Sequence, residues 1–246
     1  MATQNNSQKE IDKVDKPFPL WFMFLLPIYT GGVLSLMLFP FAGDWRWLEG
    51  WAFIITFIIN IGISYFYINR KNPRVLRNRM KLKKVGLTEA TRKPARSDFF
   101  ILPLMGLGFF GAMILPALGH RFDWTALPFA LEMAGLALTN LGFLIINIAT
   151  LQNAYASKIL DINEGQKLVD TGLYAHIRHP LYAGGVLMAF ALPFALGSWW
   201  GQFPAAAAAF ILMFRIKFEE EMLLEGMEGY ADYQKRVPYK LIPGIY

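Results

Sequence analysis

The sequence predicts an all-α fold, namely a polytopic helical membrane protein with about six membrane segments, a C-terminal helical hairpin and a cytoplasmic tail. Of the 246 residues, 55% are hydrophobic and only 17% are charged, whereas soluble domains carry about 25% charged residues. The apolar residues form uninterrupted blocks that approach the roughly 20 residues a membrane-spanning helix needs. This composition excludes disordered, collagen-like and coiled-coil proteins, and it argues against a soluble enzyme.

Four apolar blocks predict full spans, over residues 20–41, 51–69, 99–119 and 126–150. A longer apolar stretch, 181–214, is interrupted by Gly197-Ser198-Trp199-Trp200-Gly201-Gln202. Glycine and small polar residues mark turns, and paired tryptophans suit a membrane interface. The stretch therefore predicts a hairpin of two short helices, 181–196 and 203–214. Each is marginal for a full span at about 1.5 Å per residue, so part of the hairpin should lean on other helices.

The distribution of Lys and Arg predicts the orientation. The segments on one side of the predicted spans carry 22 of these residues and the segments on the other side carry 2. The positive-inside rule then places both termini in the cytoplasm. The net charge of +6 is thereby explained by topology rather than by nucleic acid. The same explanation is favoured for the basic loop 70–96, which could also bind the anionic headgroups of membrane lipids.

The order of these features predicts a domain organisation. Residues 1–19 form an N-terminal tail without the features of a signal peptide. Residues 20–150 form a four-span scaffold that contains the basic loop 70–96. Residues 151–246 form the C-terminal region that is expected to carry the functional site.

The inventory of reactive residues is short. There are no cysteines, which excludes disulfides, thiolate metal sites and cysteine nucleophiles. His176 and His179 are spaced i, i+3 and could form a pair of metal ligands, but metal centres usually need three or four ligands. We therefore expect no metal.

Two polar stretches flank the hairpin and should meet, because a hairpin returns the chain to the side it left. They contain Arg178-His179-Pro180-Leu181-Tyr182-Ala183-Gly184 and Arg215-Ile216-Lys217-Phe218-Glu219-Glu220-Glu221. Pro180 suits the first turn of a helix, whose free N–H groups favour an anion, and Arg178 offers a guanidinium fork for a carboxylate. Glu219 and Glu220 bring negative charge, while Gly184 lets a ligand or a neighbouring helix approach. The pattern predicts a site for a zwitterion.

At this level of detail the chain resembles the isoprenylcysteine carboxyl methyltransferase family, within the membrane methyltransferases that include the phospholipid methyltransferases. The resemblance rests on Arg-His-Pro-x-Tyr-x-Gly followed, after a hairpin, by Glu219-Glu220, on Gly172-Leu173-Tyr174, and on Gly229-Tyr230-Ala231-Asp232-Tyr233. It is dense over roughly the last 95 residues. Glu221 and Glu164-Gly165 depart from the pattern.

The resemblance implies S-adenosylmethionine as the methyl donor and a lipidic or small apolar acceptor that enters from the bilayer. It implies no obligate protein partner and favours a bacterial inner membrane. Arg178 and Glu220 are the catalytic pair that it implies, and Tyr230 is a further candidate on the closing tail. The residues it assigns to the cofactor are Tyr174, Arg178, His179, Pro180, Tyr182, Gly184, Glu219, Glu220 and Arg236. Asn153 and Tyr155 either line the entry of the acceptor or cap the fourth span.

Three alternatives remain open from the residues. The acceptor could be a carboxylate, which needs no general base, or a phospholipid amine, which does. A more distant alternative is an oxidoreductase resembling the sterol reductases, which use a nicotinamide cofactor, and another is a non-enzymatic membrane protein.

Glu132 lies inside the fourth predicted span, where a charge is costly, and it is expected to be protonated or paired with a group such as Asn140.

Overall fold

The structure, a computed structural model, describes residues 17–71, 73, 76, 89–124, 126–153 and 167–246. Within these ranges the regular elements are helices, listed here in chain order: α2 (Leu20–Ala42), α3 (Leu48–Lys71), α5 (Glu89–Arg121), α6 (Phe129–Gln152), η1 (Gly172–Ala175), α7 (Pro180–Ala195), α8 (Gln202–Gly226) and α9 (Tyr230–Arg236). By length and composition, α2, α3, α6 and the Ser97–Arg121 part of α5 can each cross a membrane. The predicted class, a polytopic helical membrane protein, is confirmed.

Two helix ends differ from the predicted boundaries by about ten residues, and the others by at most three. Helix α5 begins at Glu89 rather than at residue 99, so the end of the predicted basic loop is helical. Helix α8 continues to Gly226 rather than ending at residue 214. Hydropathy marks where a helix leaves an apolar environment, whereas α8 continues because Ile216, Glu220 and Met222 are buried against the rest of the protein.

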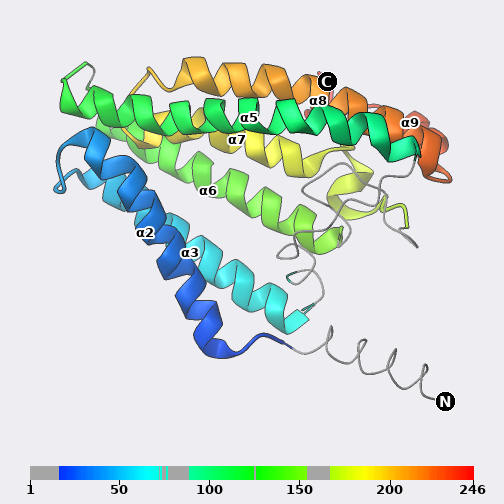
Figure 1. The fold of residues 1–246 in the computed structure, drawn as a ribbon, viewed down its shortest axis with the longest axis horizontal. Coiled ribbons are helices and arrows are strands. Elements are labelled where there is room, and N and C mark those ends of the chain that lie inside the picture. Colours follow the sequence, from blue (N-terminus) through cyan, green and yellow to red (C-terminus); the bar gives the residue numbers. More distant parts are fainter. Residues whose placement is uncertain (1–16, 72, 74–75, 77–88, 125, 154–166) are drawn as a thin grey trace.

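Figure 1 shows α5, α6, α7 and α8 lying side by side, with the α2–α3 hairpin set at an angle to them. The most extensive packing is between α6 and α7 and between α5 and α8. The α2–α3 hairpin joins them mainly through contacts of α2 with α5 and of α3 with α6. The expectation that the C-terminal hairpin leans on other helices is confirmed by these contacts, because α7 and α8 each pack along one neighbour.

Small residues allow the closest helix contacts. The carbonyl oxygen of Gly142 on α6 lies 2.6 Å from the position that a Cβ atom would take at Gly184 on α7. At the other pair, a Cβ at Gly108 on α5 would lie 2.7 Å from the Cβ of Ala208 on α8. Helices in membranes associate through such small residues because lipid offers no hydrophobic driving force for their contact.

An amide pair joins α3 to α6 within the spans. The Asn60 side chain donates to the Asn140 carbonyl oxygen and, at 2.8 Å, to the Thr56 carbonyl oxygen, while Asn140 donates to Leu136 on its own helix. Of the alternatives predicted for Glu132, pairing with Asn140 is therefore not formed in the structure. Glu132 lies in the first turn of α6, about two turns before Asn140.

Candidate active site

The two predicted polar stretches meet at the end of the bundle where α6 and α8 finish, which we call the motif end. Glycine at 172 has a φ of +63°, and the Gln152 side chain at the end of α6 accepts a hydrogen bond from the Leu173 backbone N–H at 2.9 Å. This contact fixes η1 beside α6. The chain then enters α7 with Pro180 in the first turn, as predicted.

Arg178 is buried and connects three parts of the chain. Its Nε donates to Glu220 Oε1 on α8 at 2.7 Å. Its Nη1 donates to the carbonyl oxygens of Val237 and Pro238, at 2.7 and 2.8 Å, in the segment that follows α9. The remaining nitrogen, Nη2, takes part in none of these bonds. Much of the guanidinium is therefore used to hold the site together.

The C-terminal segment, residues 237–240, is also bonded to the motif through its main chain. The Arg178 N–H donates to the Tyr239 carbonyl oxygen at 3.0 Å, and the His179 N–H donates to the Lys240 carbonyl oxygen at 2.9 Å. The Lys240 Nζ lies 3.2 Å from Glu220 Oε2. This segment therefore covers the Arg178–Glu220 pair.

Glu220 is the common acceptor of the cluster. His179 Nε2 lies 3.1 Å from Glu220 Oε1, and because an ionised carboxylate only accepts, Nε2 carries the proton. Burial works to raise the pKa of the Glu220 carboxyl, but the hydrogen bonds from His179 and Arg178 outweigh it and hold the pKa at about 2. Glu220 is thus an anion at neutral pH, although its side chain is only 7% exposed.

Glu219 has a different environment from its neighbour. The Tyr182 hydroxyl donates to Glu219 Oε2 at 2.6 Å, and the His179 and Tyr182 rings stack with centroids 5.5 Å apart. The Glu219 side chain is 23% exposed. The site therefore places one covered carboxylate next to one that is accessible.

A second buried ion pair lies directly behind Tyr182. Arg215 Nε and Nη2 donate to the two carboxylate oxygens of Asp98 at 3.0 and 3.2 Å, and Arg215 Nη1 donates to the Tyr182 hydroxyl. Arg215 lies in a polar stretch that was expected to meet the motif, but no site role was predicted for Asp98, Arg215, Lys240 or Gln152. Asp98 and Arg215 are each a charged residue at one end of an apolar run. This placement was the available sequence signal, because a buried charge needs a partner.

Two tyrosines of α9 close the cluster on one side. The Tyr233 hydroxyl donates to the Tyr174 carbonyl oxygen at 2.8 Å, which ties α9 to η1. The Tyr230 hydroxyl is buried and has no hydrogen-bond partner among the described residues. Burial and the negative charge of Glu220 raise the pKa of Tyr230, so its hydroxyl keeps its proton and is available as a donor.

The predicted site residues thus fall into three groups. The structure brings Tyr174, Arg178, His179, Pro180, Tyr182, Glu219 and Glu220 to the motif end. Gly184 packs against α6, Arg236 forms an ion pair with Asp170 at 2.8 Å that is largely exposed, and Asn153 is the C-cap residue of α6. Tyr155 lies outside the described residues.

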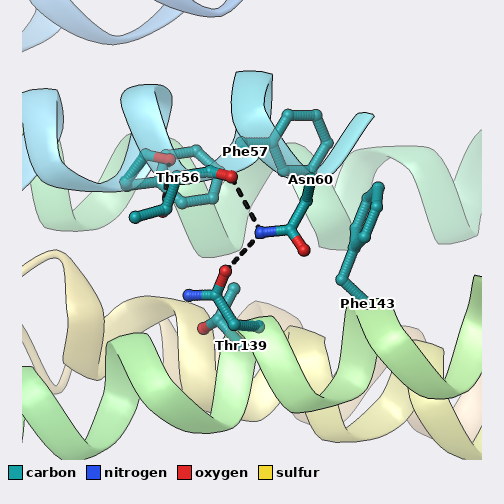
Figure 2. Close-up of a pocket in the computed structure, with 7 residues that line it drawn as sticks. Thr56, Phe57, Asn60, Thr139 and Phe143 are labelled. Atoms are coloured by element: carbon teal, nitrogen blue, oxygen red, sulfur yellow. Dashed lines mark hydrogen bonds between the residues drawn. The ribbon is translucent and has the colours of Figure 1, made fainter. Parts of the chain in front are cut away.

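A small pocket lies elsewhere, between α3 and α6. Figure 2 shows Thr56, Phe57 and Asn60 facing Thr139 and Phe143 across it, with Asn60 bonded in the middle. The polar groups here have partners within the helices, because Thr139 donates to the Gly135 carbonyl oxygen and Thr56 to that of Ala52. The pocket is separate from the charged cluster.

Together, the fold and the site define a polytopic helical membrane protein with a buried cluster of acidic and basic groups at one end. Residues 131–230 match the model of the phospholipid methyltransferase family. This segment contains α7 and α8 with the Arg178-His179-Pro180 and Glu219-Glu220 motifs. Over this segment the match confirms the predicted relation to the phospholipid methyltransferases.

Two individual proteins are also similar. A delta(14)-sterol reductase of Mus musculus is 33% identical over 85 residues, which is 33% of this chain and 20% of the reductase. The chain therefore spans about a fifth of the length of that curated relative. A solved structure of the eukaryotic intramembrane Ras methyltransferase, an isoprenylcysteine carboxyl methyltransferase, aligns over 92% of this chain and 85% of its own with a TM-score of 0.46 and 16% identity.

Proposed function

We propose that this protein is an integral-membrane methyltransferase that uses S-adenosylmethionine and transfers the methyl group to a lipidic or small apolar acceptor. The match of residues 131–230 to the phospholipid methyltransferase family supports this proposal most directly. The same segment supplies Arg178, His179, Glu219 and Glu220 of the charged cluster at the motif end. The positive-inside distribution of Lys and Arg supports a cytoplasmic motif end, and the resemblance supports a bacterial inner membrane.

The residues present fit the amino-acid head of the cofactor, which carries both an ammonium and a carboxylate. Glu219 offers a partly accessible carboxylate for the ammonium. The Tyr230 hydroxyl, buried and without a partner among the described residues, and the Arg178 guanidinium offer donors for the carboxylate. A buried donor that lacks a partner costs about 1–3 kcal/mol, so a ligand that accepts from Tyr230 would recover that cost.

When bound, the cofactor supplies an electrophilic methyl group on a sulfonium, which an acceptor attacks in line. The protein then needs to align the reactants and exclude water, effects worth up to about 7–11 kcal/mol. The Arg178–Glu220 pair and the C-terminal segment 237–240 would provide alignment and cover. His179 would keep its Nε2 proton directed at Glu220. Arg178 and Glu220 are the residues that we propose as the catalytic pair.

The acceptor that we propose is a carboxylate of an isoprenylcysteine-like or other lipidic molecule, because the motif pattern resembles the carboxyl methyltransferases. The alternative acceptor is the amine of a phospholipid headgroup, which the description of the matching family favours. A labelled methyl donor incubated with membrane extracts distinguishes them, because methyl esters are released by base and N-methyl groups are not.

The experiment that tests the cofactor is calorimetric titration of S-adenosylhomocysteine into the purified protein, first in detergent and then in lipid nanodiscs. We expect saturable binding that Arg178→Ala and Glu220→Ala weaken. Glu221→Ala is the matched control, because Glu221 is exposed on the same helix. Absence of binding in both environments would contradict the proposal.

The match to a sterol reductase supports one rival, an oxidoreductase that uses a nicotinamide cofactor. The same titration with reduced nicotinamide dinucleotides tests it. Binding of those nucleotides in place of S-adenosylhomocysteine would favour the rival. Failure of both ligands to bind would favour a non-enzymatic membrane protein.

A further inference from the structure

We infer that Asp98 and Arg215 are positioning residues for the proposed active site, and that Asp98 keeps the Arg215 guanidinium from drawing Glu219 out of place. The inference concerns a contribution from α5, which lies outside the segment that matches the family model. It rests on the proposed function only for its binding readout.

The first observation is the burial of the pair. Asp98 is 2% exposed and Arg215 is 5% exposed. Arg215 meets both oxygens of the Asp98 carboxylate with Nε and Nη2, which is the two-pronged geometry that gives Arg its directional strength. This pairing fixes the plane of the guanidinium.

The second observation is the direction of the next hydrogen bonds. A guanidinium has only donors, so the Tyr182 oxygen accepts from Arg215 Nη1. The Tyr182 proton is then directed to Glu219 Oε2, 2.6 Å away. The Arg215 Cζ lies 5.4 Å from the centroid of the Tyr182 ring, so the ring and the hydroxyl are both held.

The third observation is competition for one cation. Arg215 and Glu219 are four residues apart on α8, a spacing at which helical side chains meet and opposite charges attract. With Asp98 in place, Arg215 is turned towards α5 and reaches Glu219 through the Tyr182 hydroxyl. Besides Asp98, Glu219 is the carboxylate among the described residues that interacts electrostatically with the buried guanidinium, so we expect Arg215 to turn to it when the Asp98 charge is removed. Asp98 thereby determines whether Glu219 is available to a ligand.

The test compares Asp98→Asn, Tyr182→Phe and the double variant, using S-adenosylhomocysteine binding and thermal unfolding in detergent. Asp98→Asn preserves shape and removes the charge. We expect it to weaken binding by about tenfold, as loss of a hydrogen bond to a charged group does. Because Asp98 and Tyr182 both act on Glu219, the double variant should bind about as weakly as whichever single variant binds less tightly, which is the signature of a coupled pair.

The matched control is Asn60→Leu, which removes the half-buried amide contact between α3 and α6. It should lower the unfolding temperature and leave the dissociation constant unchanged. Arg215→Lys is the second variant in case Asp98→Asn does not fold, because it keeps both charges but cannot contact Asp98 and Tyr182 with a planar fork. It should also weaken binding.

A readout without cofactor separates the two proposals. The protein has three histidines, so ring-labelled histidine NMR with His179→Gln for assignment reports on the ring stacked against Tyr182. Asp98→Asn should move the His179 signal, and Asn60→Leu should not. Unchanged affinity with an unmoved His179 signal, or additive losses in the double variant, would overturn the inference. A wild-type protein that does not bind S-adenosylhomocysteine would contradict the proposed function, and the His179 signal would still decide the positioning role.

Discussion

Glu220 is the residue on which the charged cluster converges. Arg178, His179 and Lys240 all direct a donor at its two oxygens. A carboxylate surrounded by donors in this way offsets the free-energy cost of burying its own charge and the donors of its partners. Removing it would leave the buried Arg178 guanidinium without its counter-charge, which is a costlier change than removing one exposed partner.

The first prediction concerns the stability of the protein at low pH. The pKa of Glu220 is depressed from 4.5 to about 2 in the folded protein, so its contribution to stability is complete above the unfolded pKa and is lost as the pH falls towards 2. We expect the unfolding temperature in nonionic detergent to fall between about pH 4.5 and pH 2. Glu220→Gln should be less stable at neutral pH, by about 3–5 kcal/mol, and should lose this part of the pH profile. Glu221→Gln, the control, should keep the wild-type profile.

The second prediction uses two buried tyrosines of the same helix. Tyr233 donates to the Tyr174 carbonyl oxygen, whereas the Tyr230 hydroxyl has no partner among the described residues. Tyr233→Phe should therefore cost about 1 kcal/mol in the unliganded protein, and Tyr230→Phe should be neutral or stabilising. Chemical denaturation measures both. Equal losses would contradict the difference between the two hydroxyls.

At the scale of helices, the third prediction compares adjacent glycines of α7. A Cβ at Gly184 would lie 2.6 Å from the Gly142 carbonyl oxygen, whereas a Cβ at Gly185 meets nothing within 4 Å. Gly184→Ala should separate α6 from α7 and destabilise the protein by about 1–3 kcal/mol. Gly185→Ala should be neutral or stabilising, because alanine favours the helix by up to about 1 kcal/mol. Thermal unfolding of the two variants in detergent distinguishes them, and a loss at both positions would indicate a general intolerance of α7.

The helices themselves were largely predictable, because apolar runs and Gly-rich turns are local signals. The interruption around Trp199 and Trp200 identified the hairpin. The extension of α8 to Gly226 was not predictable from hydropathy, since Arg215 and Glu220 are charged residues beyond the end of the apolar run and their burial depends on partners elsewhere in the chain. Those partners, Asp98 and Arg178, are remote in the sequence, and pairing across such a separation depends on the tertiary packing.

At the scale of the whole molecule, the fourth prediction concerns the attachment of the α2–α3 hairpin to α6. Asn60 and Asn140 form a polar contact between them. Asn60→Leu and Asn140→Leu should each lower stability, and the double variant should lose less than their sum, with a coupling of about 0.6 kcal/mol, typical of hydrogen bonds between membrane helices. Additive losses would show that the contact contributes nothing. Binding of S-adenosylhomocysteine should be the same in all four proteins, because the pair is distant from the motif end.

The site was predictable in part. The motif residues Arg178, His179, Glu219 and Glu220 were found because a hairpin must return the chain to its starting side. Asp98 was missed because it lies in the region expected to be only a scaffold, and Lys240 because the path of the chain after α9 has no periodic signal.

The bonds between Arg178 and the C-terminal segment have a consequence for sequence variation. The acceptors are the carbonyl oxygens of Val237 and Pro238, which every amino acid possesses. Exchanging these side chains therefore leaves the acceptors in place, whereas inserting or deleting one residue between Gly229 and Val237 would move both out of reach. Homologous chains could thus differ freely in residue identity here and still be constrained to one loop length, so that alignment gaps at this point would be more informative than substitutions.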